Sequence, residues 1–238
     1  MTWSLIARDP ATNSFGIAVA TKFFAVGARV PYVESGIGAI ATQAMVNQFY
    51  GTDGLLLLEN EFPPDEVIRM LTEPDEGRDH RQVHMMDRHG VIGAYTGSAC
   101  IDWCGHIKGD GFSLAGNMLA GPRVLDDTAA AYRDNAALPF PRRLITALQA
   151  GEAAGGDKRG KQSAALVIYG EEEWADLDLR VDDHTDPLTE LARLESVSRE
   201  RFAHFRPFMP SRANPAGVTD RTIIEAEIAK ALAADPQR

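Results

Sequence analysis

The sequence predicts an α+β fold, a four-layer αββα sandwich in which two antiparallel sheets stack face to face with helices outside. The β-prone runs come in pairs joined by turn residues, which is typical of hairpins. The helical runs also come in pairs, so strands and helices do not alternate one by one as in a doubly wound parallel sheet. Runs such as 16–20 and 164–168 are apolar at nearly every position, which indicates strands covered on both faces.

Turn chemistry and β-prone residues locate the strands. Residues 2–8 and 15–23 are expected to form an opening hairpin, because Asp9-Pro10 and residues 12–14 supply the side chains that turns favour. The segment 36–44 is rich in glycine and alanine, which suits a strand pressed closely against another layer. Further strands are expected at 27–34, at 81–97 with a turn at His89-Gly90, at 111–119, at 161–170 and at 177–183.

Helical patterns fill the intervals between these strands. Proline and acidic residues open the segment 63–73, as the start of a helix favours, and glycines end the segment 139–156. Other helices are expected at 52–62, 121–135, 187–205 and 219–234. We expect residues 1–238 to form a single domain, in which 205–238 is a C-terminal extension ending in a helix.

Composition excludes several classes of partner. The formal net charge of the 238 residues is −10, and the sequence contains no basic cluster of the kind that binds a nucleic-acid backbone. No stretch approaches the roughly 20 apolar residues of a membrane span. The first residues lack the basic and apolar regions of a secretory signal. We therefore expect a cytoplasmic protein that binds neither nucleic acid nor membrane.

The cysteines give little support to a metal site. Cys100 and Cys104 could join Asp102 and His106 in a compact cluster, but no second Cys-x-x-Cys completes the usual zinc arrangement. Two cysteines are also too few for a disulfide framework, so two reduced thiols are the favoured interpretation. We expect neither a metal nor another cofactor.

Several stretches, in the same order, resemble the domain of unknown function 1028 family. They are residues 2–10, 16–28, 36–44, 116–122 and 155–167, so the resemblance runs from Thr2 to about the 180s. That family is grouped with the N-terminal nucleophile (Ntn) hydrolases, the superfamily of the proteasome β subunits, penicillin acylases and γ-glutamyltransferases. The resemblance implies an αββα sandwich whose first strand presents an N-terminal Thr, Ser or Cys.

In Ntn chemistry the N-terminal side chain is the nucleophile and the α-amine is its base. The resemblance implies that Thr2, once Met1 is removed, attacks an amide carbonyl while its own amine takes the proton. An α-amine has a pKa of about 8, so it can act as a base near neutrality. Gln43, at the end of the small-residue strand, and Asn117, before a helix, are expected to stabilise the oxyanion. A turn or capping role is the alternative for Asn117.

The sequence departs from catalytic Ntn hydrolases at two places. Enzymes of the proteasome type carry a carboxylate after the second strand and a lysine near the third. Here Thr21 or Lys22 stands at the first place, and Arg29 is the basic residue near the second. An arginine does not exchange a proton near neutrality, so Arg29 could supply only charge.

A set of polar and basic residues is expected to bind the substrate. The segment 155–162 contains Asp157 and several cations, which could hold an anionic group or could form an exposed hairpin stiffened by ion pairs. Thr42 and Gln43 end the small-residue strand, where a substrate could reach them. The expected substrate-binding residues are Lys22, Arg29, Thr42, Arg159, Gln162 and Ser163.

Two functions of different classes follow from these residues. In the first, the protein is an Ntn-type amidohydrolase that acts on a small amide or peptide-like substrate through its N-terminal threonine. In the second, it is a non-catalytic Ntn-like protein that binds a small anionic metabolite, attracted by Lys22, Arg29 and Arg159. In either case we expect a homo-oligomer with a small-molecule ligand or substrate.

Overall fold

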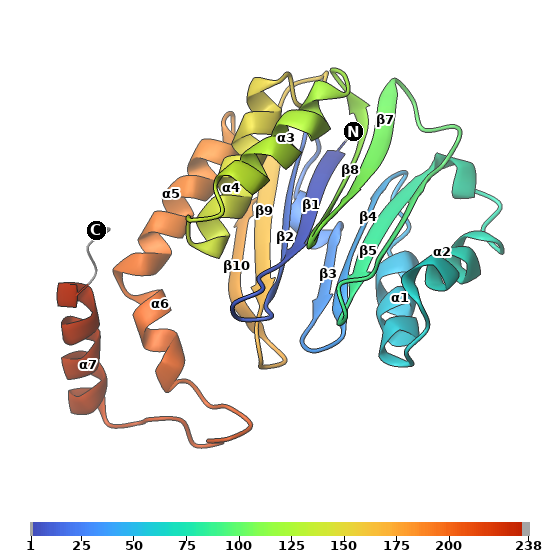
Figure 1. Cartoon of the computed structure of the whole chain (residues 1–238). Coiled ribbons are helices and arrows are strands. Elements are labelled where there is room, and N and C mark those ends of the chain that lie inside the picture. The colour runs from blue at the N-terminus through green and yellow to red at the C-terminus, as the bar shows by residue number, and fades with distance from the viewer. Residues whose placement is uncertain (1, 235–238) are drawn as a thin grey trace. The chain divides into compact units, whose positions relative to one another are not determined.

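The computed structural model describes residues 2–234, and the chain forms two compact units that divide between Leu191 and Ala192. The first unit contains both β-sheets and is the four-layer αββα sandwich that the sequence predicts (Figure 1). The second unit is helical. The expectation that the whole chain is one domain with an extension from residue 205 stays a prediction.

The larger sheet, sheet A, has six strands in the order β10-β9-β2-β1-β8-β7, and each neighbouring pair is antiparallel. Its strands are β1 (Thr2–Arg8), β2 (Phe15–Thr21), β7 (Trp103–Gly109), β8 (Phe112–Leu119), β9 (Ser163–Tyr169) and β10 (Ala175–Val181). The first strand, β1, lies between β2 and β8. Because β1 is hydrogen-bonded on both edges, its register is fixed from both sides, and Trp3 lies opposite Ala20 and Gly116.

The smaller sheet, sheet B, has four antiparallel strands in the order β3-β4-β5-β6. They are β3 (Pro31–Glu34), β4 (Gly38–Ala44), β5 (Arg81–Asp87) and β6 (Ile92–Thr96). One pair of helices packs on sheet B and the other on sheet A (Figure 1). These pairs are α1 (Phe49–Glu59) with α2 (Pro64–Thr72), and α3 (Arg123–Asp134) with α4 (Phe140–Ala153).

Apolar side chains join each layer to the next. Sheet B and its two helices share a buried cluster that includes Ile40 and Val67. Between the sheets, a second cluster contains Ile6 and Val19 of sheet A and Met86 of sheet B. Burial of each such side chain contributes about 1.5–3 kcal/mol. This second cluster fills one part of the space between the sheets.

Most predicted strands of the first unit are confirmed, but β7 was not predicted. Its sequence, WCGHIKG, has no apolar run. The strand lies at the edge of sheet A and is only partly buried, so its side chains need not be apolar. The predicted strand 27–34 begins only at Pro31, because Val26–Ala28 form a short 3₁₀-helix.

The second unit contains the end of α5 (Pro187–Glu200), then α6 (Phe202–Phe205) and α7 (Arg221–Ala234). The predicted helix 187–205 is therefore broken near Arg201. Arg201 forms an ion pair with Glu225 of α7, 2.6 Å between Nη2 and Oε1. Both side chains are exposed, so this ion pair contributes little to the free energy of unfolding.

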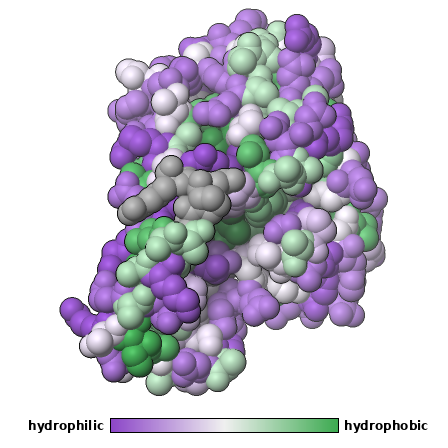
Figure 2. Space-filling view, turned by 60° about the vertical axis from the view of Figure 1, so that its left-hand side comes forward, coloured by the Kyte–Doolittle hydropathy of each residue, from purple (hydrophilic) through white to green (hydrophobic). Residues whose placement is uncertain are grey.

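Polar side chains make up most of the surface in the view of Figure 2, with hydrophobic residues between them. Some large apolar side chains are exposed close to strand ends. Phe23 and Phe24 follow β2 and are each 57% exposed, and Phe49 at the start of α1 is 71% exposed. Within residues 2–234, every helix is too short or too polar to cross a membrane.

The contact between α1 and β3 gives a test of this packing. A Cβ atom at Gly51 of α1 would overlap the Tyr32 ring of β3 at its attachment carbon, which cannot move away as a flexible chain end could. Overpacking costs about 1–3 kcal/mol, whereas alanine gains about 1 kcal/mol over glycine within a helix. We therefore expect Gly51→Ala to lower the free energy of unfolding by up to about 2 kcal/mol in urea denaturation.

The matched control is Gly121→Ala. A Cβ atom at Gly121 meets no other atom within 4 Å. This variant should be neutral or slightly more stable, because alanine reduces the entropy of the unfolded chain. Equal effects of the two substitutions would contradict the tight contact between Gly51 and Tyr32.

Candidate functional site

Polar side chains fill the other part of the space between the sheets, and we call this group the polar layer. It contains Thr2, Ser4, Gln43, Gln82, His84, Ser113 and Asn117. The strands β1 and β8 contribute from sheet A, and β4 and β5 from sheet B. Thr2 is 7% exposed and the other members at most 1%. Groups this deeply buried need hydrogen-bond partners inside the protein.

Gln82 connects the two sheets within the polar layer. Its Oε1 accepts hydrogen bonds from Gln43 Nε2 at 2.8 Å and from Asn117 Nδ2 at 2.9 Å. Its Nε2 is within hydrogen-bonding distance of the carbonyl oxygens of Gly116 at 2.8 Å and Gly105 at 3.0 Å and of Thr96 Oγ1 at 2.9 Å, and its two hydrogens are shared among these three acceptors. Since Gln82 lies on β5 and both glycines lie on sheet A, these bonds fix one sheet against the other.

His84 lies between two serines and is neutral. Ser4 Oγ donates its hydrogen to Gln43 Oε1 at 2.7 Å, so it accepts from His84 Nε2–H at 2.8 Å. His84 Nδ1 then accepts from Ser113 Oγ at 2.9 Å. Burial, and secondly the charge of nearby His106, lower the pKa of His84 to about 3. His84 is therefore a fixed donor to Ser4 and not an acid or base near neutrality.

The three residues predicted as catalytic do come together. Asn117 is the register partner of Thr2. The Thr2 carbonyl oxygen accepts from Gln43 Nε2 and from Asn117 Nδ2, each at 3.4 Å. The Thr2 hydroxyl donates to Thr21 Oγ1 at 3.2 Å. Each amide NH₂ thus directs one hydrogen to Thr2 and one to Gln82, which leaves neither amide a spare hydrogen for an oxyanion.

A pocket of about 160 Å³ lies at this end of the polar layer. Its lining residues are Ala44, Met45, His80, Ala99, Cys100, Ile101, Asn117 and Met118. Apart from His80 and Asn117, these side chains are apolar or weakly polar. Asn117 Oδ1 is buried and has no hydrogen-bond partner within the described part of the chain.

The backbone is strained beside two members of the polar layer. Ala44 follows Gln43 and has φ 69°, and Met118 follows Asn117 and has φ 54°. Residues other than glycine rarely adopt this left-handed conformation, which costs about 1–2 kcal/mol. Both strained residues line the pocket. Such strain concentrates at functional sites, where the surrounding structure maintains it.

Two of the predicted substrate-binding residues line a pocket other than the one beside Asn117. Lys22 and Gln162 line a separate pocket of about 390 Å³, together with Lys161, Asp183, His184 and Thr185. There, Lys22 Nζ donates to the Lys161 carbonyl at 3.3 Å, and Gln162 Nε2 donates to Asp183 at 3.0 Å. This pocket therefore already contains bonds between its own polar groups.

Arg159 forms an ion pair with a buried carboxylate, that of Asp157. Asp157 is 3% exposed, and its Oδ2 accepts from the Lys22 amide at 2.7 Å and from Arg159 Nη2 at 3.2 Å. Asp157 thereby joins the end of β2 to the loop before β9. The segment 155–162 was expected either to bind an anion or to form an exposed hairpin stiffened by ion pairs. These contacts favour the ion pairs, although Asp157 itself is buried.

The other three predicted residues make contacts elsewhere. Ser163 Oγ donates to the Phe23 carbonyl at 2.5 Å and accepts from the Val26 amide at 3.1 Å, so it shapes the loop after β2. Thr42 Oγ1 donates to the Asn47 carbonyl at 3.0 Å. Arg29 is exposed. None of these three side chains is among the residues that line the 160 Å³ pocket.

The cysteines make ordinary thiol contacts. Cys100 Sγ donates to the Arg81 carbonyl at 3.4 Å, and Cys104 Sγ to the Cys100 carbonyl at 3.5 Å. Burial raises the pKa of both thiols, so they are protonated near neutrality. Among the described residues, no three His, Cys, Asp or Glu side chains form a group that could hold a metal ion.

Gln82 and His84 were not predicted for the site. They alternate with Val83 and Met85 on β5, so two polar side chains occupy successive positions on one face of a buried strand. That spacing was the available signal, since a buried polar side chain needs a partner. Their partners on β1 and β8 are distant in the sequence, so the contacts themselves could not be predicted.

Replacing Gln82 tests its role between the sheets. Gln82→Met keeps a similar side-chain volume but leaves the hydrogen-bonding groups of Gln43, Asn117 and Gly116 without their partner. Each buried group left unpaired costs about 1–3 kcal/mol. We expect the free energy of unfolding to fall by at least about 3 kcal/mol in urea denaturation. The control Gln48→Met, at an exposed position, should change it by less than about 0.5 kcal/mol.

The neutral state of His84 predicts how stability depends on pH. The folded protein keeps His84 unprotonated down to about pH 3, whereas the unfolded chain protonates it near its ordinary pKa of 6.5. The unfolded state therefore binds the extra proton between these values, and the contribution is complete above pH 6.5 and is lost as the pH falls. The expected slope from His84 is about 1.4 kcal/mol per pH unit between pH 4 and 6.

Urea denaturation from pH 4 to 7 measures this slope. His84→Gln should flatten it by about that amount, because glutamine does not titrate. The exposed His89→Gln is the control and should leave the slope unchanged. An identical slope in the wild type and in His84→Gln would disprove the buried, neutral state of His84.

Comparison with known proteins gives a relative of similar fold. The crystal structure of protein SPO2555 from Silicibacter pomeroyi, a DUF1028 protein, is 31% identical with a TM-score of 0.86, covering 92% of this chain and 96% of that one. Anbu (ancestral beta-subunit) from Yersinia bercovieri is 10% identical with a TM-score of 0.42, covering 82% of this chain and 94% of that one. No curated protein matches the sequence.

The family model for DUF1028, described as a family of unknown function, matches residues 2–191. This range ends at the residue where the first compact unit ends. It contains the polar layer and both pockets described above. The chain therefore belongs to the DUF1028 family.

Proposed function

We propose that the protein hydrolyses a small amide, with Thr2 as the nucleophile after removal of Met1. One observation carries the proposal: Thr2 begins the central strand of sheet A, and its register partner Asn117 forms part of the wall of the 160 Å³ pocket. A substrate in that pocket would lie beside the first residue of β1. The position of Thr2 at the start of this strand, together with the αββα arrangement, is also the reason that we propose Ntn-type chemistry.

The proposed reaction needs no group beyond the first residue and water. The Thr2 hydroxyl attacks the amide carbonyl carbon and its proton passes to the α-amine. The C–N bond of the substrate breaks, the α-amine returns the proton to the leaving amine, and an ester forms on Thr2. Water then hydrolyses this ester and restores the hydroxyl. The α-amine has a pKa of about 8, so it can accept the first proton near neutrality.

We assign Gln43 and Asn117 as positioning residues in this reaction. Their amide groups hold the Thr2 carbonyl oxygen, and Gln82 holds both amides in turn. The Thr21 hydroxyl lies 3.2 Å from that of Thr2 and restricts its rotation. A nucleophile held in this way loses little freedom when a substrate binds, which lowers the entropic barrier of the attack.

The pocket favours a substrate with a small apolar group. Its walls include Met45, Ile101 and Met118, and its volume of about 160 Å³ suits one short apolar side chain or acyl group. The buried Asn117 Oδ1 offers an acceptor for a substrate N–H. We therefore propose an amide of a short apolar acyl group or amino acid.

A binding function remains the second candidate, because Lys22 and Gln162 line a pocket of about 390 Å³ with Lys161 and His184. A small anionic metabolite could be attracted there. However, Lys161 Nζ is 3.0 Å from Asp186 Oδ1, and Asp183 also lines the pocket. These carboxylates reduce the positive charge that an anion would meet, so the hydrolase is the better supported proposal.

Two measurements test the nucleophile. The intact mass of the protein purified from its native source should lack one methionine. Hydrolysis of p-nitroanilides of short apolar acyl groups should then fall at least about 10³-fold in kcat/KM in Thr2→Ala, because the nucleophile is removed. Thr2→Ser keeps a hydroxyl and should retain measurable hydrolysis.

Thr52→Ala removes an exposed hydroxyl on α1 and serves as the control, with no expected change in rate. A retained methionine in the native protein, or full activity in Thr2→Ala, would rule out the N-terminal mechanism. Binding of an anion that Lys22→Gln weakens and Thr2→Ala leaves unchanged would then favour the second candidate.

A further inference from the structure

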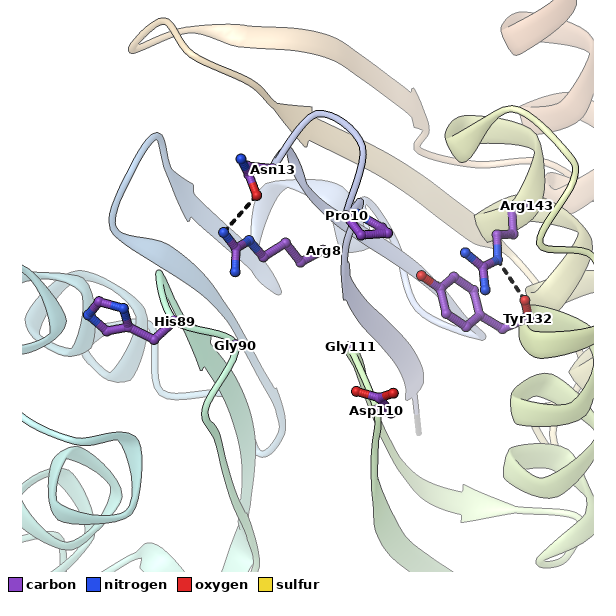
Figure 3. A pocket seen from close by; sticks show the side chains of 9 residues that line it. All are labelled: Arg8, Pro10, Asn13, His89, Gly90, Asp110, Gly111, Tyr132 and Arg143. Carbon is purple, nitrogen blue, oxygen red and sulfur yellow. Dashed lines mark hydrogen bonds between the residues drawn. The ribbon is translucent and has the colours of Figure 1, made fainter.

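A third pocket lies at the opposite end of β1 from Thr2. Its volume is about 420 Å³, and Arg8, the last residue of β1, forms part of its wall. The strand between Thr2 and Arg8 has seven residues, so the two ends are about 20 Å apart. Figure 3 shows the residues that line this cavity, which are Arg8, Pro10, Asn13, His89, Gly90, Asp110, Gly111, Tyr132 and Arg143.

The guanidinium of Arg8, which lines this cavity, has one hydrogen-bond donor without a partner in the part of the chain that the structure describes. Its Nη2 donates to Asn13 Oδ1 at 2.7 Å, but its Nε is buried and has no partner among the described residues. Within residues 2–234, the neighbouring Asp9 forms no ion pair with Arg8; its carboxylate accepts from Ala11 and Thr12 in its own turn, and its charge also acts on Tyr132. A partly buried guanidinium without a carboxylate partner favours binding of an anion.

Arg143 and Tyr132 form the opposite wall of the cavity (Figure 3). The guanidinium carbon of Arg143 lies 3.7 Å from the Tyr132 ring centroid, and Arg143 Nε donates to the Tyr132 carbonyl at 2.6 Å. The other side of the ring is near Phe112, 5.1 Å between centroids. These contacts hold the Tyr132 ring in place, and Figure 3 shows its hydroxyl directed away from its own helix and toward the cavity.

Asp110 is the carboxylate that lines this cavity, and the hairpin explains its presence. Asp110 and Gly111 form the two-residue turn between β7 and β8, where Gly111 has φ 71°. Aspartate followed by glycine is a common sequence in such turns. In the described part of the chain, neither Arg8 nor Arg143 forms an ion pair with a carboxylate. The residues that line the cavity thus include two arginines and one aspartate, and the charge of Asp9 also acts on Tyr132 in its wall.

We propose that this cavity binds a small organic anion whose carboxylate or phosphoryl groups contact Arg8 on one wall and Arg143 with the Tyr132 hydroxyl on the other. The overall charge of −10 makes a basic pocket on this chain a local feature instead of a general property of its surface. Planar, forked donors such as arginine suit the oxygens of both kinds of anion. The site is separate from the one proposed for Thr2.

Isothermal titration calorimetry at low ionic strength tests the proposal with two probes, citrate for carboxylates and pyrophosphate for phosphoryl groups. At least one should bind saturably, and the tighter of the two identifies the kind of anion. Arg8→Gln and Arg143→Gln should each weaken binding about tenfold or more, the usual loss for a hydrogen bond to a charged group. Asp110→Asn should strengthen binding about threefold by removing a like charge.

Arg123→Gln is the matched control, because Arg123 is an exposed cation that pairs with Asp127 and is not among the residues lining this cavity. It should leave the affinity unchanged. Arg8→Lys and Arg143→Lys keep the charge and provide a second test if either glutamine variant unfolds; each should still weaken binding, since the forked geometry is lost. Failure of both probes to bind, or unchanged affinity in a folded Arg8 or Arg143 variant, would overturn the proposal.

Discussion

The satisfaction of buried polar groups between the two sheets is the constraint on which the rest of this structure depends. Hydrophobic contact is non-directional, so the apolar cluster around Ile6 and Met86 favours stacking without choosing one arrangement. Hydrogen bonds require particular atoms at particular distances. Gln82 of sheet B bonds to Gly105 and Gly116 of sheet A, and any shift of one sheet would leave these groups unpaired. The polar layer therefore sets how the sheets align.

The same constraint holds the beginning of β1 in place. Chain ends usually fray, because few contacts hold them. Here Gln43 and Asn117 bind the Thr2 carbonyl from two different sheets, and Gln82 joins the two amides. The strain at the residues after Gln43 and Asn117 is maintained by this network. Residues predicted to stabilise an oxyanion thus serve, in this arrangement, to fix the residue that would react.

Much of the fold could be predicted from local signals. Turn residues and apolar runs located most strands of the sandwich, whereas β7 was missed because an edge strand needs no apolar pattern. For the site, the role of Thr2 was expected from a resemblance, and Gln43 and Asn117 were expected from amide side chains at a strand end and before a helix. The hydrogen-bond partners of Gln82 and His84 could not be predicted, because these bonds join strands that are far apart in the sequence. Charge suggested Arg29 and Arg159 as anion-binding residues, whereas the pairing of Arg159 with the buried Asp157 could not be predicted from charge.

The position of β1 also decides how the two proposed sites can influence each other. Thr2 and Arg8 are the ends of one strand that is hydrogen-bonded along both edges, in registers without a shift. Coupling between distant sites requires an element with two arrangements that both sites bias. A central strand paired on both sides offers no second arrangement without breaking its ladders. An anion held by Arg8 and Arg143 would therefore leave the geometry at Thr2 unchanged, and its effect would be confined to the end of the sandwich where it binds.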